Sequence, residues 1–206
     1  MTLAKALKAL PKADRDLAKF MKISPQCELG KGEPPYRNHF ETLLKAVVSQ
    51  QISTKAADSI TQKLRLLIED DFSPGRLLSV PLDELRGAGL SGAKARTVTE
   101  LAEAIISGGI SVDDFEEMPD HEITAALTQV WGIGRWTVEM FLMFSLARLD
   151  VWPSGDLGVR RGWSLIKGEP MLDAKALEPF GEPFRPYRSV VAWYCWQATD
   201  LLKEPK

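Results

Sequence analysis

The stretch Leu127-Thr-Gln-Val-Trp-Gly-Ile-Gly-Arg-Trp-Thr-Val-Glu-Met-Phe141 decides the fold of this chain. Its apolar residues recur at helical spacing on both sides of a turn, and Gly132 and Gly134 let that turn take positive φ at low steric cost. We therefore expect a helix, a tight turn and a second helix. The first amides of the second helix lack partners within it, so together with Arg135 they suit a phosphate group. An ordinary corner between two helices explains the same pattern.

The rest of the chain alternates amphipathic segments with short Gly/Pro turns. No stretch shows the sustained period-two alternation of a strand, so we expect an all-α fold of about ten helices. Pro11 is expected to interrupt the first helix, and Asn38 and Ser53 to cap later ones. Besides the helix after the turn, the expected helices cover residues 1–22, 39–51, 54–68, 74–78, 81–86, 96–107, 112–117, 119–130, 156–167, 173–178 and 186–202.

The composition is that of a globular protein, with 45% apolar and 26% charged residues. No apolar run is long enough to span a bilayer, and the N-terminus lacks the uninterrupted apolar segment of a secretory signal. Cys27 and Cys195 make neither a metal-binding pattern nor a disulfide framework. We expect a reduced, cytoplasmic protein without an iron–sulfur cluster.

The charge of the chain is unevenly distributed. A formal net charge of −2 does not by itself indicate a nucleic-acid-binding protein. Residues 99–130, however, carry eight acidic side chains and no Lys or Arg, so the rest of the chain carries +6. This pattern fits a basic face with an acidic back, and it equally fits two unrelated solvated surfaces.

Asp156 is the candidate catalytic residue. It follows the loop Asp150-Val-Trp-Pro-Ser-Gly155 and precedes a predicted helix that contains Arg160 and Arg161. Capping of that helix is the ordinary role of an aspartate at this place. A carboxylate there can also oppose positive charge that develops on a substrate.

Four motifs occur in order: Gln50-Gln51-Ile-Ser53, Gly89-Leu-Ser-Gly-Ala-Lys94, Gly132-Ile-Gly-Arg-Trp-Thr137 and Asp150-Val-Trp-Pro-Ser-Gly-Asp156. Together they resemble the helix-hairpin-helix DNA glycosylases with a Gly/Pro-rich loop and a following aspartate (HhH-GPD), and within them the 3-methyladenine DNA glycosylase II branch. The resemblance runs from about Tyr36 to Leu202. It implies a two-lobed all-α fold with a DNA cleft between the lobes. One lobe would contain residues 1–35 and 150–206, and the other residues 36–149.

The resemblance also implies a role for each matching position. Asp156 would be catalytic, and Trp136 and Trp196 would line the base pocket. Gln51 would fill the gap that a flipped base leaves in the duplex. The implied DNA contacts are Gln51, Ser53, Gly89, Gly92, Lys94, Arg96, Gly132, Gly134, Arg135 and Thr137. The backbone carbonyls of Thr128, Val130 and Ile133 would hold a Na⁺ or K⁺ ion, and no organic cofactor is expected.

Trp136 distinguishes two subclasses of the family. Bifunctional members place a nucleophilic lysine at this position, and the indole offers no amine for a Schiff base. The indole can instead stack on a flipped base, where a cationic base gains cation–π attraction. Packing of the hairpin is the ordinary role for such a tryptophan. For Trp196, likewise, core packing is the ordinary role.

The resemblance implies a monofunctional DNA glycosylase of base excision repair. The substrates would be 3-methyladenine-type bases, with 7-methylguanine, hypoxanthine and ethenoadenine as further candidates. The expected partner is double-stranded DNA with a damaged base, bound by a monomer in the cytoplasm, at the nucleoid, or in a eukaryotic nucleus. Two alternatives stay open: a non-catalytic helix-hairpin-helix DNA-binding module, and a bifunctional oxidised-base glycosylase with lyase activity.

Overall fold

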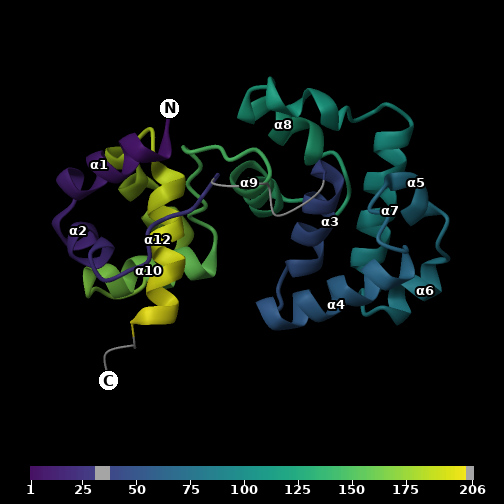
Figure 1. Ribbon diagram of the computed structural model, residues 1–206, viewed down its shortest axis with the longest axis horizontal. Coiled ribbons are helices and arrows are strands. Elements are labelled where there is room, and N and C mark those ends of the chain that lie inside the picture. The colour runs from purple at the N-terminus through teal and green to yellow at the C-terminus, as the bar shows by residue number, and fades with distance from the viewer. Residues whose placement is uncertain (31–37, 203–206) are drawn as a thin grey trace. The chain divides into compact units, whose positions relative to one another are not determined.

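The computed structural model describes residues 1–30 and 38–202, in which helices are joined by turns and loops (Figure 1). The described residues contain twelve α-helices, two 3₁₀ helices and no strand, so the all-α prediction is confirmed. Contacts within the chain divide it into two compact units. The first unit comprises Met1–Glu33 and Ala147–Lys206, and the second comprises Pro34–Leu146.

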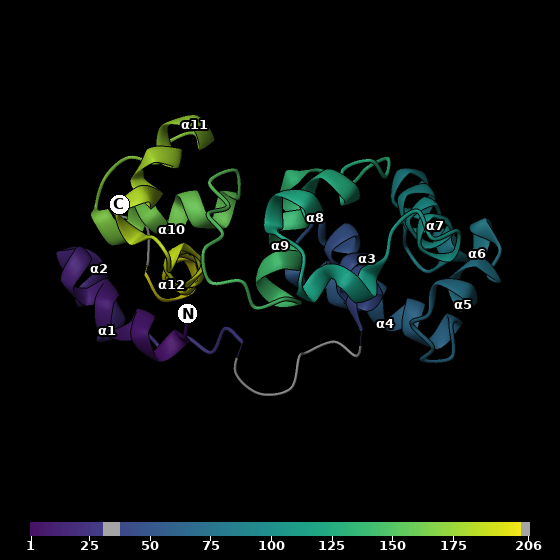
Figure 2. The same ribbon diagram turned by 90° about the horizontal axis from the view of Figure 1, so that it is seen from above.

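The first unit is built around the last helix, α12 (Arg188–Leu201), which packs mainly against α10 (Leu157–Lys167) (Figure 2). The apolar side of α12 is buried, including Val191, Tyr194 and Cys195. Burial of these side chains is the main favourable term that holds such a helix pair together. The unit also contains α1 (Leu3–Ala13), α2 (Arg15–Met21), α11 (Ala174–Leu177) and the 3₁₀ helix η2 (Glu178–Phe184).

The N-terminal segment corrects one prediction. Residues 1–22 form two helices, and the break falls at Asp14 rather than at Pro11. Pro11 lies in the last turn of α1, where its missing N–H costs little beyond one helical hydrogen bond. Asp14 ends α1 in an extended conformation and caps α2, because its carboxylate accepts the amides of Asp16 and Leu17 at 3.0 and 2.8 Å.

The second unit is built around α3 (His39–Ser49), which contacts α4 (Thr54–Leu67), α7 (Gly92–Ile106) and α9 (Arg135–Phe144) (Figure 1). The buried residues of α3 include Phe40, Leu44 and Val47. Nearby in the same unit, Phe141 of α9 packs edge-on against Phe115. The other elements are α5 (Pro74–Leu78), α6 (Leu82–Gly87), the 3₁₀ helix η1 (Val112–Glu116) and α8 (Asp120–Leu127).

The helix boundaries follow local capping. Asn38 and Ser53 cap α3 and α4, as predicted, through hydrogen bonds from the amides of Glu41 and Ala56. The expected helix at residues 96–107 begins earlier, at Gly92, because the Ser91 hydroxyl accepts the amide of Lys94. None of the helices in the described part of the chain is long and apolar enough to cross a bilayer.

Candidate functional site

The turn between α8 and α9 uses its two glycines differently. Gly132 has φ +83°, and a Cβ there would lie 2.1 Å from the Thr97 hydroxyl oxygen, so both the turn and its packing need glycine. Gly134 has φ −102° and caps α9, so the expectation of positive φ holds for Gly132 alone. A Cβ on Gly134 would meet no atom of the described chain within 4 Å. Nothing in the packing of the hairpin therefore requires a glycine here, and the amides at the start of α9 are open to close approach.

The start of α9 also fits anion binding. No side chain caps this helix, in contrast to α3, α4 and α7, whose first amides are bonded by Asn or Ser. Arg135 is the first residue of α9, two-thirds of its side chain is exposed, and it pairs with Glu139 at 2.7 Å. A phosphate at this end would meet uncapped amides and a guanidinium.

Thr137 lies in the interior. Its side chain is buried, its hydroxyl accepts a hydrogen bond from Gln50 Nε2 at 2.9 Å, and its amide donates to the carbonyl of Gly134 at 3.0 Å. These contacts favour a structural role for Thr137 over the DNA contact expected from the sequence.

The second glycine turn leads into α7. Gly89 has φ +112°, and a Cβ there would lie 3.0 Å from a side-chain carbon of Ile60, whereas Gly92 is open. Arg96, one turn into α7, pairs with Glu100 at 2.6 Å. The Arg96 guanidinium also lies 4.3 Å from the ring centroid of Trp131, so the side chain bridges α7 and the hairpin.

Lys94 is directed inward rather than outward. Its ammonium donates to the main-chain carbonyls of Val48 and Gln50, both at 2.7 Å. Partial burial lowers its pKa from the ordinary lysine value. This geometry favours a structural role over the expected phosphate contact. The Gln50–Ser53 turn that it holds keeps Gln51 and Ser53 exposed, and the Ser53 hydroxyl caps α4.

Asp156 is the N-cap of α10, so the ordinary role expected from its position is present. Its Oδ1 accepts the amide of Val159 at 2.8 Å and also the indole N–H of Trp196, from α12, at 2.9 Å. The carboxylate is half-buried. Two N–H donors from different elements fix one oxygen of the carboxylate, which orients the group as a whole.

The contact between Trp196 and Asp156 depends on two glycines that sequence reasoning missed. A Cβ on Gly162 would lie 1.8 Å from the main-chain oxygen of Cys195, and one on Gly158 would lie 2.7 Å from the Trp196 ring. These glycines therefore let α10 and α12 approach closely enough to join the indole to the carboxylate. The available signal was a pair of glycines four residues apart inside a predicted helix, which usually marks close packing.

The loop that leads to Asp156 is anchored at each end. At its start, Asp150 pairs with Arg188 at 2.7 Å and with Arg185 at 2.9 Å. Near its end, the Ser154 hydroxyl donates to the Glu178 carboxylate. Trp152, between them, is buried and donates its indole N–H to the carbonyl of Leu177 at 3.3 Å. The loop is thus fixed to η2 and α12, so it delivers Asp156 to a defined place.

Cys195 neighbours this carboxylate but does not act as a nucleophile. Its side chain is fully buried, and burial together with the charge of Asp156 raises the pKa of the thiol far above its ordinary value. The thiol therefore stays protonated, and a protonated buried thiol is inert.

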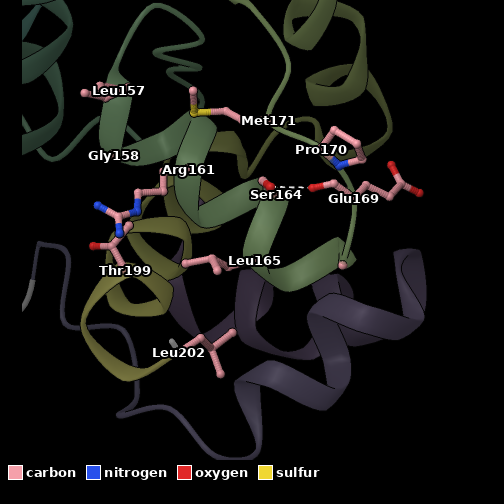
Figure 3. Close-up of a pocket in the computed structure, with 11 residues that line it drawn as sticks. Leu157, Gly158, Arg161, Ser164, Leu165, Glu169, Pro170, Met171, Thr199 and Leu202 are labelled. Atoms are coloured by element: carbon pink, nitrogen blue, oxygen red, sulfur yellow. Dashed lines mark hydrogen bonds between the residues drawn. The ribbon is translucent and has the colours of Figure 1, made fainter. Parts of the chain in front are cut away.

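A cavity of about 1000 Å³ lies along α10 in the same unit (Figure 3). Leu157, Met171 and Leu202 line its apolar part, with Arg161 and Glu169 as charged members. Asp156 and Trp196 are not among its lining residues, although Leu157 and Gly158, which directly follow Asp156, line it.

The fold and the site together define a helix-hairpin-helix protein in which a pinned loop carries an aspartate to a helix N-terminus. The model of the HhH-GPD superfamily of base excision DNA repair proteins matches residues 44–180. The chain belongs to this superfamily.

Relatives of known name are similar over most of the chain. DNA-3-methyladenine glycosylase 1 of Schizosaccharomyces pombe is 35% identical over 181 residues, which cover 86% of this chain and 77% of the relative. A solved structure of the S. pombe 3-methyladenine DNA glycosylase, in complex with abasic DNA, matches with a TM-score of 0.89 and 31% identity over 98% of this chain and all of the other. A DNA-3-methyladenine glycosidase from Bacillus halodurans matches with a TM-score of 0.80 and 33% identity, over 97% of this chain and 91% of the other.

Proposed function

We propose that the protein is a monofunctional DNA glycosylase of base excision repair that releases alkylated bases from double-stranded DNA. The observation that carries this proposal is Asp156, a half-buried carboxylate held by the amide of Val159 and the indole of Trp196. Its support includes relatives that are named 3-methyladenine glycosylases. One of the similar solved structures holds abasic DNA, which is the product of such a reaction.

The chemistry needs a single carboxylate. Hydrolysis of an N-glycosidic bond builds positive charge on the deoxyribose, and a fixed anion near C1′ stabilises that charge. The same carboxylate can orient or deprotonate the attacking water. An alkylated purine is already cationic and leaves readily, so a second acidic group for protonation of the base is not required.

The absence of an amine at Trp136 supports hydrolysis without strand cleavage. A lyase needs a nucleophilic amine that forms a Schiff base with the sugar. Trp136 is half-buried on α9. Lys94, which follows the other glycine turn, is engaged with two backbone carbonyls of its own unit. We therefore disfavour the bifunctional alternative.

Recognition would combine a phosphate grip with stacking on the flipped base. The uncapped start of α9 and Arg135 would bind the backbone of the damaged strand. Trp136 would stack on an electron-poor base, and cation–π attraction would favour 3-methyladenine-type lesions over neutral bases. The Trp196 indole would serve the pocket mainly through its hydrogen bond to Asp156. We expect the protein to act as a monomer in the cellular compartment that contains the DNA.

A monovalent cation at the hairpin belongs to the same proposal. The backbone carbonyls of Thr128, Val130 and Ile133 are hard oxygen donors of the kind that suit Na⁺ or K⁺. In support of this, Val130 and Ile133 lie in one tight turn, since the Val130 carbonyl accepts the Ile133 amide at 3.1 Å. A bound cation would supply positive charge next to a DNA phosphate.

The enzyme and the non-catalytic module are separated by incubation with methylated duplex DNA. We expect release of free 3-methyladenine, measured by chromatography, together with abasic sites that break only when heated in alkali. Binding to DNA without base release would favour the module. Borohydride trapping on abasic DNA should give no covalent adduct, and an adduct would establish the lyase.

A further inference from the structure

The turn between α3 and α4 is strained at one residue. Gln51 has φ +56°, a conformation that a residue with a side chain adopts at a cost in free energy. The strained residue is exposed, and it sits two residues before Ser53, the cap of α4. Within the described part of the chain no hydrogen bond of the Gln51 side chain accounts for this conformation, so we look to the neighbouring residues that hold the turn.

The Lys94 side chain restrains this turn through two hydrogen bonds to its backbone. Its ammonium binds the carbonyl of Val48, in the last turn of α3, and the carbonyl of Gln50, one residue before the strained position. Helix C-terminal carbonyls lack partners within the helix, and a cation is a strong donor to them. One side chain thus fixes the direction in which the chain leaves α3.

The Gln50 side chain restrains the same turn through hydrogen bonds to the hairpin and to α9. Its Nε2 donates to the carbonyl of Gly132 at 3.0 Å and to the hydroxyl of Thr137 at 2.9 Å. Gly132 belongs to the hairpin turn, and Thr137 lies in the first turn of α9. The amide side chain therefore ties the Gln50–Ser53 turn to the hairpin within one unit of the fold.

We propose that Gln50 and Lys94 are positioning residues for base flipping, which hold Gln51 in its strained conformation at a fixed place relative to the hairpin. This inference rests on the proposed function and on the role that the sequence resemblance implies for Gln51, which would fill the gap left by the flipped base. The hairpin grips the DNA backbone, and the Gln50 amide transmits that position to the turn. Lys94 keeps Gln51 from relaxing into the ordinary conformation, which would turn its side chain away from the duplex.

The test compares three variants with one control. Lys94→Met keeps the unbranched apolar stem of the side chain and removes both hydrogen bonds to the carbonyls. Gln50→Met does the same for the contacts to the hairpin. Lys94→Arg restores donors and should recover most of the wild-type behaviour. Lys63→Met, on the exposed surface of α4, removes a lysine charge from the same unit without touching the turn.

Two readouts follow the Gln51 side chain rather than general stability. The first is the fluorescence of 2-aminopurine opposite an abasic site, which rises when a side chain enters the gap. We expect Lys94→Met and Gln50→Met to lower this rise by about half or more. The second is base release from a methylated purine, either paired or opposite an abasic site analogue. We expect a loss of about tenfold on the paired lesion and less than about threefold on the other, where flipping is already easy.

A double-mutant cycle with Gln51→Ala decides whether Lys94 acts through Gln51. If it does, Lys94→Met added to Gln51→Ala should slow base release by less than about twofold further, because the side chain that it positions is gone. Additive losses would overturn the proposal, and so would equal losses on the two substrates. If Lys94→Met does not fold, the same cycle is run with Gln50→Met. The fluorescence readout needs no base release, so it judges the inference even if the wild-type protein proves to be non-catalytic.

Discussion

At the scale of single residues, Asp156 combines a cap and a charge. Asparagine caps helices about as well as aspartate, and its side-chain oxygen can accept the same bonds from Val159 and Trp196. We expect Asp156→Asn to melt within about 3 °C of the wild type, because the cap is kept. Base release should fall by about 100-fold or more, since the stabilising charge is lost. Binding to abasic DNA should change little.

The measurement is single-turnover release of a methylated base, with melting followed by circular dichroism. Near-normal turnover by Asp156→Asn would remove the carboxylate from the mechanism. A large drop in melting temperature would instead show that the charge itself supports the fold.

Substitution of Trp196 distinguishes between two roles of this residue: orientation of the Asp156 carboxylate and stacking on the flipped base. Trp196→Phe keeps an aromatic ring on α12 and removes the N–H that binds Asp156 Oδ1. We expect base release to slow by about tenfold while DNA binding stays near normal, because a misaligned carboxylate is less effective in the transition state. Trp193→Phe is the matched control, since Trp193 lies on the same helix and packs on Tyr194. Equal activity of the two variants would assign Trp196 to stacking alone.

The sequence predicted the place of Asp156 but not its partner. A carboxylate after a Pro-Ser-Gly loop at a helix start is visible in the chain order, because capping is local. The donor from Trp196 comes 40 residues later, and only the packing of two helices brings it near. The inward direction of Lys94 was likewise hidden, because its acceptors are backbone carbonyls that every residue possesses.

At the scale of elements, the closeness of α10 and α12 sets the geometry of the site. Gly162→Ala would place a methyl group 1.8 Å from the Cys195 carbonyl oxygen, so the helices must separate. We expect a loss of about 3 kcal/mol in unfolding free energy, somewhat offset by the better helix propensity of alanine. Base release should fall as well, because separation of the helices moves Trp196 away from Asp156.

Thermal unfolding checks this prediction, with Gly87→Ala as the control. A Cβ on Gly87, at the end of α6, meets nothing within 4 Å of the described chain, so that variant should be as stable as the wild type. If Gly162→Ala proved equally stable, the close helix contact would not be required by the fold.

Element boundaries show which local signals are reliable in this chain. The side-chain caps at Asn38 and Ser53 were predictable because the acceptor and its amides lie within three residues. The sequence predicts the first interruption at Pro11, whereas the break lies at Asp14. Proline is the usual interruption of a helix, but a proline in the last turn removes only one helical hydrogen bond, so α1 continues through Pro11. The Asp14 carboxylate, which also pairs with Lys167, determines the break.

At the scale of the whole molecule, net charge and DNA affinity are separate properties. The chain carries −2, but eight of its 28 acidic residues lie at 99–130, where there is no Lys or Arg, so the rest of the chain carries +6. DNA binding depends on the few cations near phosphates, because each contact releases counterions from the duplex. Arg96 and Arg135, which lie beside the two glycine turns, are the expected phosphate partners among the exposed cations.

We therefore expect salt-dependent binding by a net acidic protein. With about two phosphate contacts, the association constant for abasic duplex should fall by about 10-fold between 50 and 200 mM salt. Arg135→Gln should lower the affinity. It should also reduce the steepness of log K against log salt by about the amount that one phosphate contact contributes. Asp113→Asn, in the acidic segment, should leave the slope unchanged, because it alters net charge without touching a phosphate. Fluorescence anisotropy over a salt series measures all three, and a slope that followed net charge alone would contradict the assignment of the hairpin arginine.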